Sequence, residues 1–298
     1  MPLDRFLAGL DRELAEFEAG GIAKGPEPIV TEVIRPRGDK GTRVRLAGCG
    51  DREFIRMNSN SYLGLSVREE VIKAAEGGAA RYGAGPGAVR FISGTYEPHT
   101  RLEQRLAAFH GREDCMLTNS AYTSVMGVVV TLTTPETIII SDELNHNCII
   151  SAVRLARPKD RIVYKHLDMA DLEKRIVASI GKGTTVLIIT DGIFSMRGEY
   201  APLDRIVELA KRHDDKYPRG ILVVVDDSHG VGALGQTGRG TEELTGVHAD
   251  VLVATLGKAL AVNGGYIVSE KDVLKYLRQK NPLYIYTNPI TPAEAMSA

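Results

Sequence analysis

The residues of this sequence that could do chemistry lie just after runs of apolar residues. Lys258 follows ADVLVAT (249–255), while Asp226 and His229 follow ILVVV (221–225). An unpaired charge is costly to bury, so a charged residue at the end of a buried strand favours a binding or catalytic role. A nucleophilic amine, a carboxylate and an imidazole together suit pyridoxal phosphate, whose aldehyde needs a lysine and whose ring nitrogen needs an acid.

Each of these residues also has an ordinary interpretation. Taken alone, Lys258 resembles a surface lysine, and Asp226 could cap a helix. His146 could be a core histidine with satisfied hydrogen bonds, and Ser195 could cap the turn before Arg197. A structural or surface role is favoured for the other histidines, which are His99, His110, His166, His213 and His248.

The elements that position these residues are predicted from continuous apolar runs. Such runs span 136–141, 184–190, 221–226 and 249–255. Helical patterns lie between several of them, at 169–180 and 203–213, and two more precede them at 67–83 and 99–111. Strands that are apolar on both faces predict a largely parallel α/β sheet covered by helices.

Ligands of such sheets bind beyond the carboxyl ends of the strands. The polar residues that leave these strands are Ser141, Asp142, Asn145 and His146, then 191–195, 226–229 and 255–258. We expect these groups to face one site. The segment MLTNSAYTSVMG (116–127), in which small polar residues open a helix, offers main-chain amides for a phosphate.

A glycine-rich stretch, YGAGPG (82–87), superficially matches a dinucleotide-binding loop. A helical pattern precedes it where the dinucleotide fingerprint requires a strand. We therefore interpret this stretch as a flexible loop near the substrate entrance.

The N-terminal region and the composition predict further elements and the general class of the protein. Apolar residues at helical spacing predict an amphipathic helix over 3–17, whose apolar face must contact either the main body or a second subunit. Short strands are predicted to follow at 29–34, 42–48 and 54–59. The net charge of −1 gives no reason to expect nucleic acid or a membrane as partner. Three widely spaced cysteines, no signal peptide and no long apolar run predict a soluble, cytoplasmic protein without a disulfide framework or metal site.

Six motifs resemble those of the α-oxoamine synthase family of pyridoxal-phosphate enzymes, and they occur in the order in which that family has them. These motifs are NSYLGL (60–65), the segment 82–111, SDELNHNCI (141–149), TDGIFSMRG (190–198), DDSHGVGALGQTGRG (226–240) and ATLGKAL (254–260). The stretches RFISGTYEPHTRLEQRLAAF (90–109) and YIYTNPITP (284–292) are most similar to glycine C-acetyltransferases, also called 2-amino-3-ketobutyrate CoA ligases. The resemblance implies the aspartate aminotransferase fold (fold type I), with a mostly parallel central sheet flanked by helices.

Matched by position, the resemblance implies a role for each residue at the centre of the site. Lys258 would hold the cofactor covalently and then move the substrate Cα proton, and Asp226 would pair with the pyridinium nitrogen. His229 would bond the phenolic oxygen of the ring. His146 would stack on the ring face and help to orient the substrate.

The resemblance also implies contacts at the edges of the cofactor. Ser195 would contact the ring region, and Thr255 would hold the phosphate together with the amides of Ala121 and Tyr122. Asn60 would lie near the amino-acid carboxylate. Two further residues, Thr287 and Asn288, match positions that reach the phosphate of a neighbouring subunit, which implies a homodimer with shared sites.

The reaction implied by the resemblance joins an amino acid, glycine in the first instance, to an acyl-CoA such as acetyl-CoA. The products would be coenzyme A and a 2-amino-3-oxo compound, with or without decarboxylation. The alternatives are 8-amino-7-oxononanoate synthase, an activity like that of serine palmitoyltransferase, and a non-catalytic partner subunit of the same fold.

The domain organisation expected from this resemblance has three parts. Residues 1–60 would hold the N-terminal helix and short strands, 61–280 the large α/β domain, and 281–298 the start of a C-terminal domain that is largely absent. In the family that domain carries an arginine for the substrate carboxylate. Three smaller features depart from the family pattern. Asn147–Cys148 stands where relatives often have Ala–Ser, and Arg197 stands where an acidic residue is common. The segment LAVNGGY (260–266) is slightly shortened.

Overall fold

The computed structural model describes residues 2–298, and the chain divides into two compact units, Met1–Asn58 and Ser59–Ala298. The first contains helix α1 (Pro2–Ala19) and an antiparallel pair of strands, β1 (Val30–Ile34) and β2 (Arg43–Leu46). The predicted helix and the first two predicted strands are thus confirmed. The expected strand over 54–59 is wrong, because Phe54 makes only an isolated bridge to Val44.

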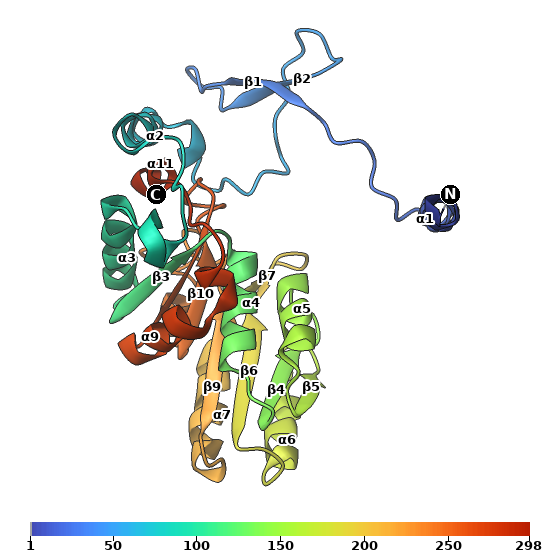
Figure 1. Cartoon of the computed structure of the whole chain (residues 1–298), viewed down its shortest axis with the longest axis vertical. Helices are drawn as coiled ribbons and strands as arrows, with labels where there is room; N and C mark the ends of the chain where they lie inside the picture. The colour runs from blue at the N-terminus through green and yellow to red at the C-terminus, as the bar shows by residue number, and fades with distance from the viewer. Residues whose placement is uncertain (1) are drawn as a thin grey trace. The chain divides into compact units, whose positions relative to one another are not determined.

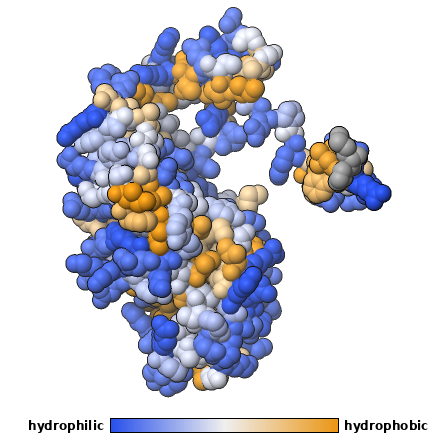
Figure 2. Space-filling model, viewed as in Figure 1, coloured by the Kyte–Doolittle hydropathy of each residue, from blue (hydrophilic) through white to orange (hydrophobic). Residues whose placement is uncertain are grey.

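The apolar stripe of α1 is exposed along its whole length, and Figure 2 shows apolar side chains gathered on one side of this helix. Its members are Leu3, Phe6, Leu7, Leu10, Leu14 and Phe17. What covers this stripe stays a prediction.

The second unit is built on a seven-stranded sheet in the order β3-β11-β10-β9-β6-β4-β5 (Figure 1). Strands β10, β9, β6, β4 and β5 are parallel, whereas β11 runs antiparallel between β3 and β10. The strands are β3 (Asp114–Thr118), β4 (Thr137–Asp142), β5 (Asp160–Tyr164), β6 (Thr185–Asp191), β9 (Ile221–Asp226), β10 (Val251–Thr255) and β11 (Gly265–Ser269). The predicted, mostly parallel α/β sheet is confirmed.

Helices cover both faces of this sheet because successive strand residues point to opposite sides. On one face Ile138, Ile140 and Val225 pack with α3 (Glu97–His110), α6 (Met169–Ser179) and α7 (Leu203–His213). On the other face Ile139 and Val224 pack with α4 (Ala121–Leu132), α5 (Asn147–Ala156) and α9 (Lys271–Lys280). The result is a three-layer α/β/α unit.

The remaining elements complete the second unit. These are α2 (Glu69–Tyr82), α8 (Thr241–Thr245), α10 (Pro282–Ile285), α11 (Pro292–Ser297), the hairpin strands β7 (Ile193–Phe194) and β8 (Glu199–Tyr200), and the short helical turns Leu65–Val67, Arg90–Gly94 and Asp214–Lys216. Across the described residues, no helix has the length and apolar content needed to cross a membrane. The division at residue 60 and a further domain beginning at 281 stay predictions.

The three central parallel strands β4, β6 and β9 each end in an aspartate, namely Asp142, Asp191 and Asp226. Asp191 and Asp226 are paired in register across β6 and β9. The sheet therefore delivers several carboxylates to one edge, where its loops diverge.

Candidate active site

A cavity of about 610 Å³ lies at this edge of the sheet. It is lined by most of the residues that the sequence predicts for the site, from several different elements. These are Ala121, Tyr122, His146, Ser195, Asp226, His229, Thr255 and Lys258. The structure therefore brings together residues that are far apart in the sequence.

Lys258 lies on the loop between the antiparallel neighbours β10 and β11. Main-chain hydrogen bonds from Leu256 N–H to the Gly264 carbonyl (3.0 Å) and from Val262 N–H to the Leu256 carbonyl (3.1 Å) brace this loop. Burial lowers the pKa of Lys258, and the nearby carboxylates of Asp226 and Asp191 oppose that shift only in part. A lysine with a lowered pKa is the form that reacts with carbonyl groups.

Asp226 is a buried carboxylate, 6% exposed, that faces donors on both of its oxygens. Oδ1 accepts hydrogen bonds from the hydroxyl of Ser228 (2.6 Å) and from its main-chain N–H (3.2 Å). Oδ2 accepts from the Cys148 thiol at 3.5 Å. Within residues 2–298 no lysine, arginine or histidine side chain comes within ion-pair distance of Asp226, so its charge lacks a direct counter-ion from this chain.

His229 is held by the phenol of Tyr62, whose oxygen lies 2.5 Å from Nδ1. Burial lowers the pKa of His229 to about 4, and the positive charge of Lys258 contributes. Burial also raises the pKa of Tyr62, so the phenol keeps its proton, which it can donate to Nδ1. With Nδ1 assigned as the acceptor, the neutral imidazole carries its own proton on Nε2, where it can donate to a ligand oxygen.

His146 stands at the N-cap of α5 and is held in place by its main chain. Its N–H donates to Asp191 Oδ2 at 2.6 Å. The Asn145 amide bridges β6 on the same side, because it donates to the Ile189 carbonyl and accepts from Asp191 N–H. Burial, followed by the negative charge of Asp226, raises the pKa of Asp191.

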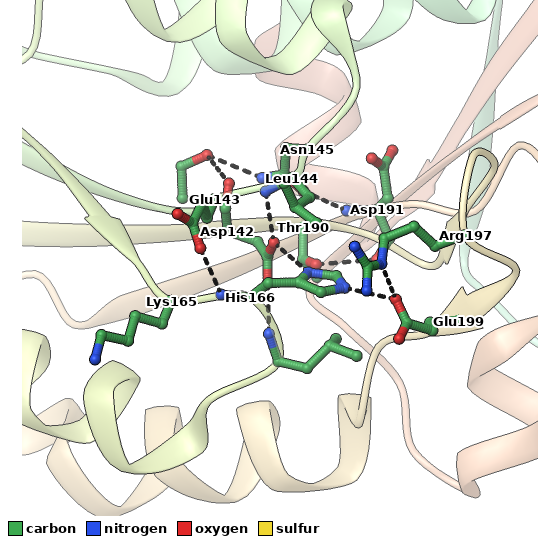
Figure 3. Close-up of polar contacts among 12 residues, drawn as sticks. Asp142, Glu143, Leu144, Asn145, Lys165, His166, Thr190, Asp191, Arg197 and Glu199 are labelled. Carbon is green, nitrogen blue, oxygen red and sulfur yellow. Dashed lines mark hydrogen bonds and ion pairs between the residues drawn. The ribbon is translucent and has the colours of Figure 1, made fainter.

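A chain of hydrogen-bonded polar side chains runs from Asp142, at the end of β4, to Arg197 (Figure 3). His166 Nδ1 lies 2.8 Å from Asp142 Oδ1, and its Nε2 lies 3.0 Å from Glu199 Oε2. The same Glu199 oxygen accepts from Arg197 Nε at 2.7 Å. His166 thus has the structural role expected for it, while Arg197 lines the cavity.

The N-terminus of α4 provides main-chain donors at the cavity wall. Ser120 caps this helix by accepting from Thr123 N–H at 3.2 Å, which leaves the first-turn amides of Ala121 and Tyr122 facing outward from the helix end. Strand β11 approaches so closely that a Cβ on Gly265 would lie 2.3 Å from Ala121 N. An anion at this helix end is stabilised by the amides and by the helix dipole.

Three of the predicted residues do not line this cavity. Asn60 is exposed on the segment before the turn at 65–67, and Asn288 is exposed after α10. The hydroxyl of Thr287 donates to the Leu283 carbonyl. Their predicted contacts with substrate carboxylate and a second subunit stay predictions.

The structure also identifies two site residues that were not among the candidates, Tyr62 and Cys148. Asn145, Asp191 and Ser228 were expected at the site as polar residues at strand ends, and the structure shows their hydrogen-bonding partners there. Tyr62 lies in the motif NSYLGL and Cys148 in SDELNHNCI, so a search for hydrogen-bonding partners around the candidates is the signal that could have found them.

The donor set fits pyridoxal phosphate. The buried Asp226 carboxylate, which lacks a counter-ion, matches a protonated ring nitrogen, and Lys258 matches the aldehyde. The Nε2–H of His229 matches the ring hydroxyl, and the helix N-terminus at Ala121 matches the phosphate.

Comparisons with known proteins point to the same cofactor. Residues 52–298 match the family model described as aminotransferase class I and II. The chain is 44% identical over 292 residues to a 2-amino-3-ketobutyrate coenzyme A ligase of Salmonella typhimurium, an alignment that covers 97% of this chain and 69% of the relative. It is 41% identical over 249 residues to an 8-amino-7-oxononanoate synthase of Thermosipho melanesiensis, covering 83% of this chain and 62% of the relative.

Solved structures agree with these relatives. The serine palmitoyltransferase of Sphingomonas wittichii superposes with a TM-score of 0.85 at 27% identity, covering 99% of this chain and 70% of that one. The chain thus spans between about three fifths and seven tenths of the length of the proteins named here. It belongs to the aminotransferase class I and II family and, within that family, to the α-oxoamine synthases, which depend on pyridoxal phosphate.

Proposed function

We propose that this protein is an acyltransferase that condenses glycine with an acyl-CoA, in the first instance acetyl-CoA, to give a 2-amino-3-oxo product and coenzyme A. The observation that carries the proposal is one cavity lined by both an amine of lowered pKa, Lys258, and a buried carboxylate without a direct counter-ion, Asp226. The 44% identity to a 2-amino-3-ketobutyrate coenzyme A ligase supports glycine and acetyl-CoA as substrates.

The bound cofactor supplies an electron-withdrawing ring that acidifies the Cα–H bond of the amino acid. Lys258 then takes up the Cα proton at Nζ, for which its lowered pKa is suited, because a neutral amine is the base. Asp226 would keep the ring nitrogen protonated by holding a negative charge beside it. The carboxylate is stabilised for this by the donors from Ser228 and Cys148.

The remaining residues orient the ligands. His229, whose Nδ1 faces Tyr62, would donate Nε2–H to the ring hydroxyl. The ring of His146, which lines the cavity, would help to orient the amino acid. Ser195 contacts the ring region. Thr255 Oγ1, which accepts from Gly257 N–H at 3.0 Å, contributes to phosphate binding with the amides of Ala121 and Tyr122, completing the contacts proposed for the cofactor.

We further propose that the protein works in the cytoplasm as a homodimer with shared sites. In this arrangement Thr287 and Asn288 reach the phosphate of the second subunit, and Asn60 approaches the carboxylate of the amino acid. Their exposed or half-buried positions in the single chain leave them available for such contacts.

A second candidate function is that of 8-amino-7-oxononanoate synthase, which is favoured by the 41% identity to the Thermosipho relative. A third, non-catalytic, candidate is a partner subunit that keeps the fold. The presence of Lys258, Asp226 and His229 in one cavity argues against the third candidate.

Two experiments test these proposals. Added pyridoxal phosphate should give a visible absorption band that is absent in Lys258→Ala and unchanged in Lys182→Ala, an exposed control. Release of coenzyme A should then be measured with glycine, alanine and serine, each paired with acetyl-CoA and longer acyl-CoAs. A missing band would refute the enzyme proposal, and a response confined to alanine with a long acyl donor would replace glycine acyltransfer by the second candidate.

A further inference from the structure

A buried thiol lies between two of the residues that face the proposed cofactor. Cys148 is the second residue of α5 and is 2% exposed. Its Sγ lies 2.9 Å from His146 Nδ1 and 3.5 Å from Asp226 Oδ2. The side chain therefore connects the helix end that carries His146 to the strand end that carries Asp226.

The main chain of Cys148 already occupies one of these two acceptors. Its N–H donates to His146 Nδ1 at 3.2 Å and caps the helix. An Nδ1 that accepts this bond carries no proton, so the neutral ring of His146 has its proton on Nε2. The helix cap therefore selects the tautomer of His146 without the thiol.

Because the main-chain N–H already uses the lone pair of His146 Nδ1, we assign the thiol proton to Asp226 Oδ2 at 3.5 Å and not to the nearer Nδ1 at 2.9 Å. Burial raises the pKa of Cys148, and the negative charges of Asp226 and Asp191 raise it further, so the thiol stays protonated. Ser228 provides both donors to Oδ1 of Asp226, whereas at Oδ2 the thiol is the donor that the described residues provide. Removing the thiol proton leaves one oxygen of a buried carboxylate without a donor from this chain.

We propose that Cys148 is a positioning residue that orients the Asp226 carboxylate toward the ring nitrogen of pyridoxal phosphate by donating its thiol proton to Oδ2. The proposal rests on the cofactor contact proposed for Asp226, but it does not depend on which amino acid or acyl-CoA is used.

The test measures the binding of pyridoxal phosphate alone to the cofactor-free chain, followed by its absorption spectrum. Cys148→Ala removes the donor and should weaken binding about fivefold, the size of one net hydrogen bond. It should also shift the pH at which the visible band changes, which a loss of packing would not do. Cys148→Ser keeps a donor on a side chain of similar shape and should restore both properties.

Cys115 offers a matched control, because it is also a fully buried thiol, lies on β3, and has no side-chain hydrogen bond among the described residues. Cys115→Ala should lose comparable thermal stability while its affinity and its spectrum stay those of the unmodified protein. If Cys148→Ala behaves like Cys115→Ala in affinity and in pH dependence, the inference is wrong.

Asp226→Asn separates this inference from the proposed function. Weakened binding in Asp226→Asn, together with unchanged binding in Cys148→Ala, would overturn the role of the thiol alone. Unchanged binding in Asp226→Asn would overturn the cofactor contact on which both depend. Weakened binding in both variants, with rescue by Cys148→Ser, supports the inference.

Discussion

Asp227, the residue after Asp226, should make the stability of the protein depend on pH in an unusual direction. Its side chain is fully buried and accepts hydrogen bonds from Thr241 N–H and Thr241 Oγ1, both at 2.6 Å. Burial is the largest cause that raises its pKa, from 3.8 to about 7, against the opposing effect of these hydrogen bonds. The folded protein therefore holds a proton that the unfolded chain releases.

The direction in which stability changes with pH depends on whether the folded or the unfolded state binds the proton more tightly. Because the folded pKa is raised, the stability contributed by the protonated carboxyl is fully present below about pH 4 and is lost as the pH rises through about 7. The two pKa values differ by about three, and each pH unit corresponds to about 1.36 kcal/mol, so the loss is roughly 4 kcal/mol. An asparagine at this position has almost the same shape and cannot ionise.

Asp227→Asn should therefore gain stability over the unmodified protein as the pH rises. The free energy of unfolding of both proteins would be measured in urea at several pH values between about 4 and 8, and the difference between them plotted. We expect the difference to grow by roughly 4 kcal/mol across this range in favour of the variant. The exposed Asp215→Asn serves as a control for an added asparagine. Parallel curves for Asp227→Asn and the unmodified protein would refute the reasoning.

Three further changes have expected outcomes. Tyr62→Phe removes the hydroxyl that faces His229 Nδ1, so the affinity for pyridoxal phosphate, measured by spectroscopic titration, should fall about fivefold. An unchanged affinity would contradict the tautomer assigned to His229. Gly265→Ala places a Cβ 2.3 Å from Ala121 N. Thermal unfolding should show that the protein loses about 1–3 kcal/mol of stability, and cofactor binding should weaken. Unchanged stability and unchanged binding would show that the helix end can move. Iodoacetamide should modify Cys49 before the two buried thiols, as mass spectrometry can check, and early labelling of either buried thiol would argue against the packing described here.

Much of the fold could be predicted from the sequence because its central strands are continuous apolar runs. The run at 221–226 coincides with β9, and the run at 184–190 differs from β6 by one residue at each end. Strand β11 (GYIVS) was not predicted, because its apolar run is only three residues long, and its antiparallel direction leaves no mark in the sequence. Strand β5 was not predicted either, because it lies at an edge of the sheet and has exposed charged residues instead of an apolar run.

The residues of the candidate site could likewise be predicted only in part. Lys258 and Asp226 could be selected because a charged residue at the end of a buried strand needs an explanation. Tyr62 could not, because it lies in a polar segment and acquires its importance from a hydrogen bond to a residue 167 positions away. Cys148 escaped selection for a related reason, since its contact with Asp226 depends on how α5 meets β9.

The antiparallel β11 also has a consequence for synthesis on the ribosome. Strand β3 emerges early, yet its sheet partner at 265–269 is made about 150 residues later. Until then β3, which is an edge strand paired only with β11 in the described sheet, has no main-chain partner on either side, so the growing chain exposes unpaired strand edges that favour aggregation. The same late strand packs against the start of α4, so the helix end proposed to bind phosphate can reach its final surroundings only after residue 265 has been made. A nascent chain arrested before residue 265 should therefore fail to retain pyridoxal phosphate.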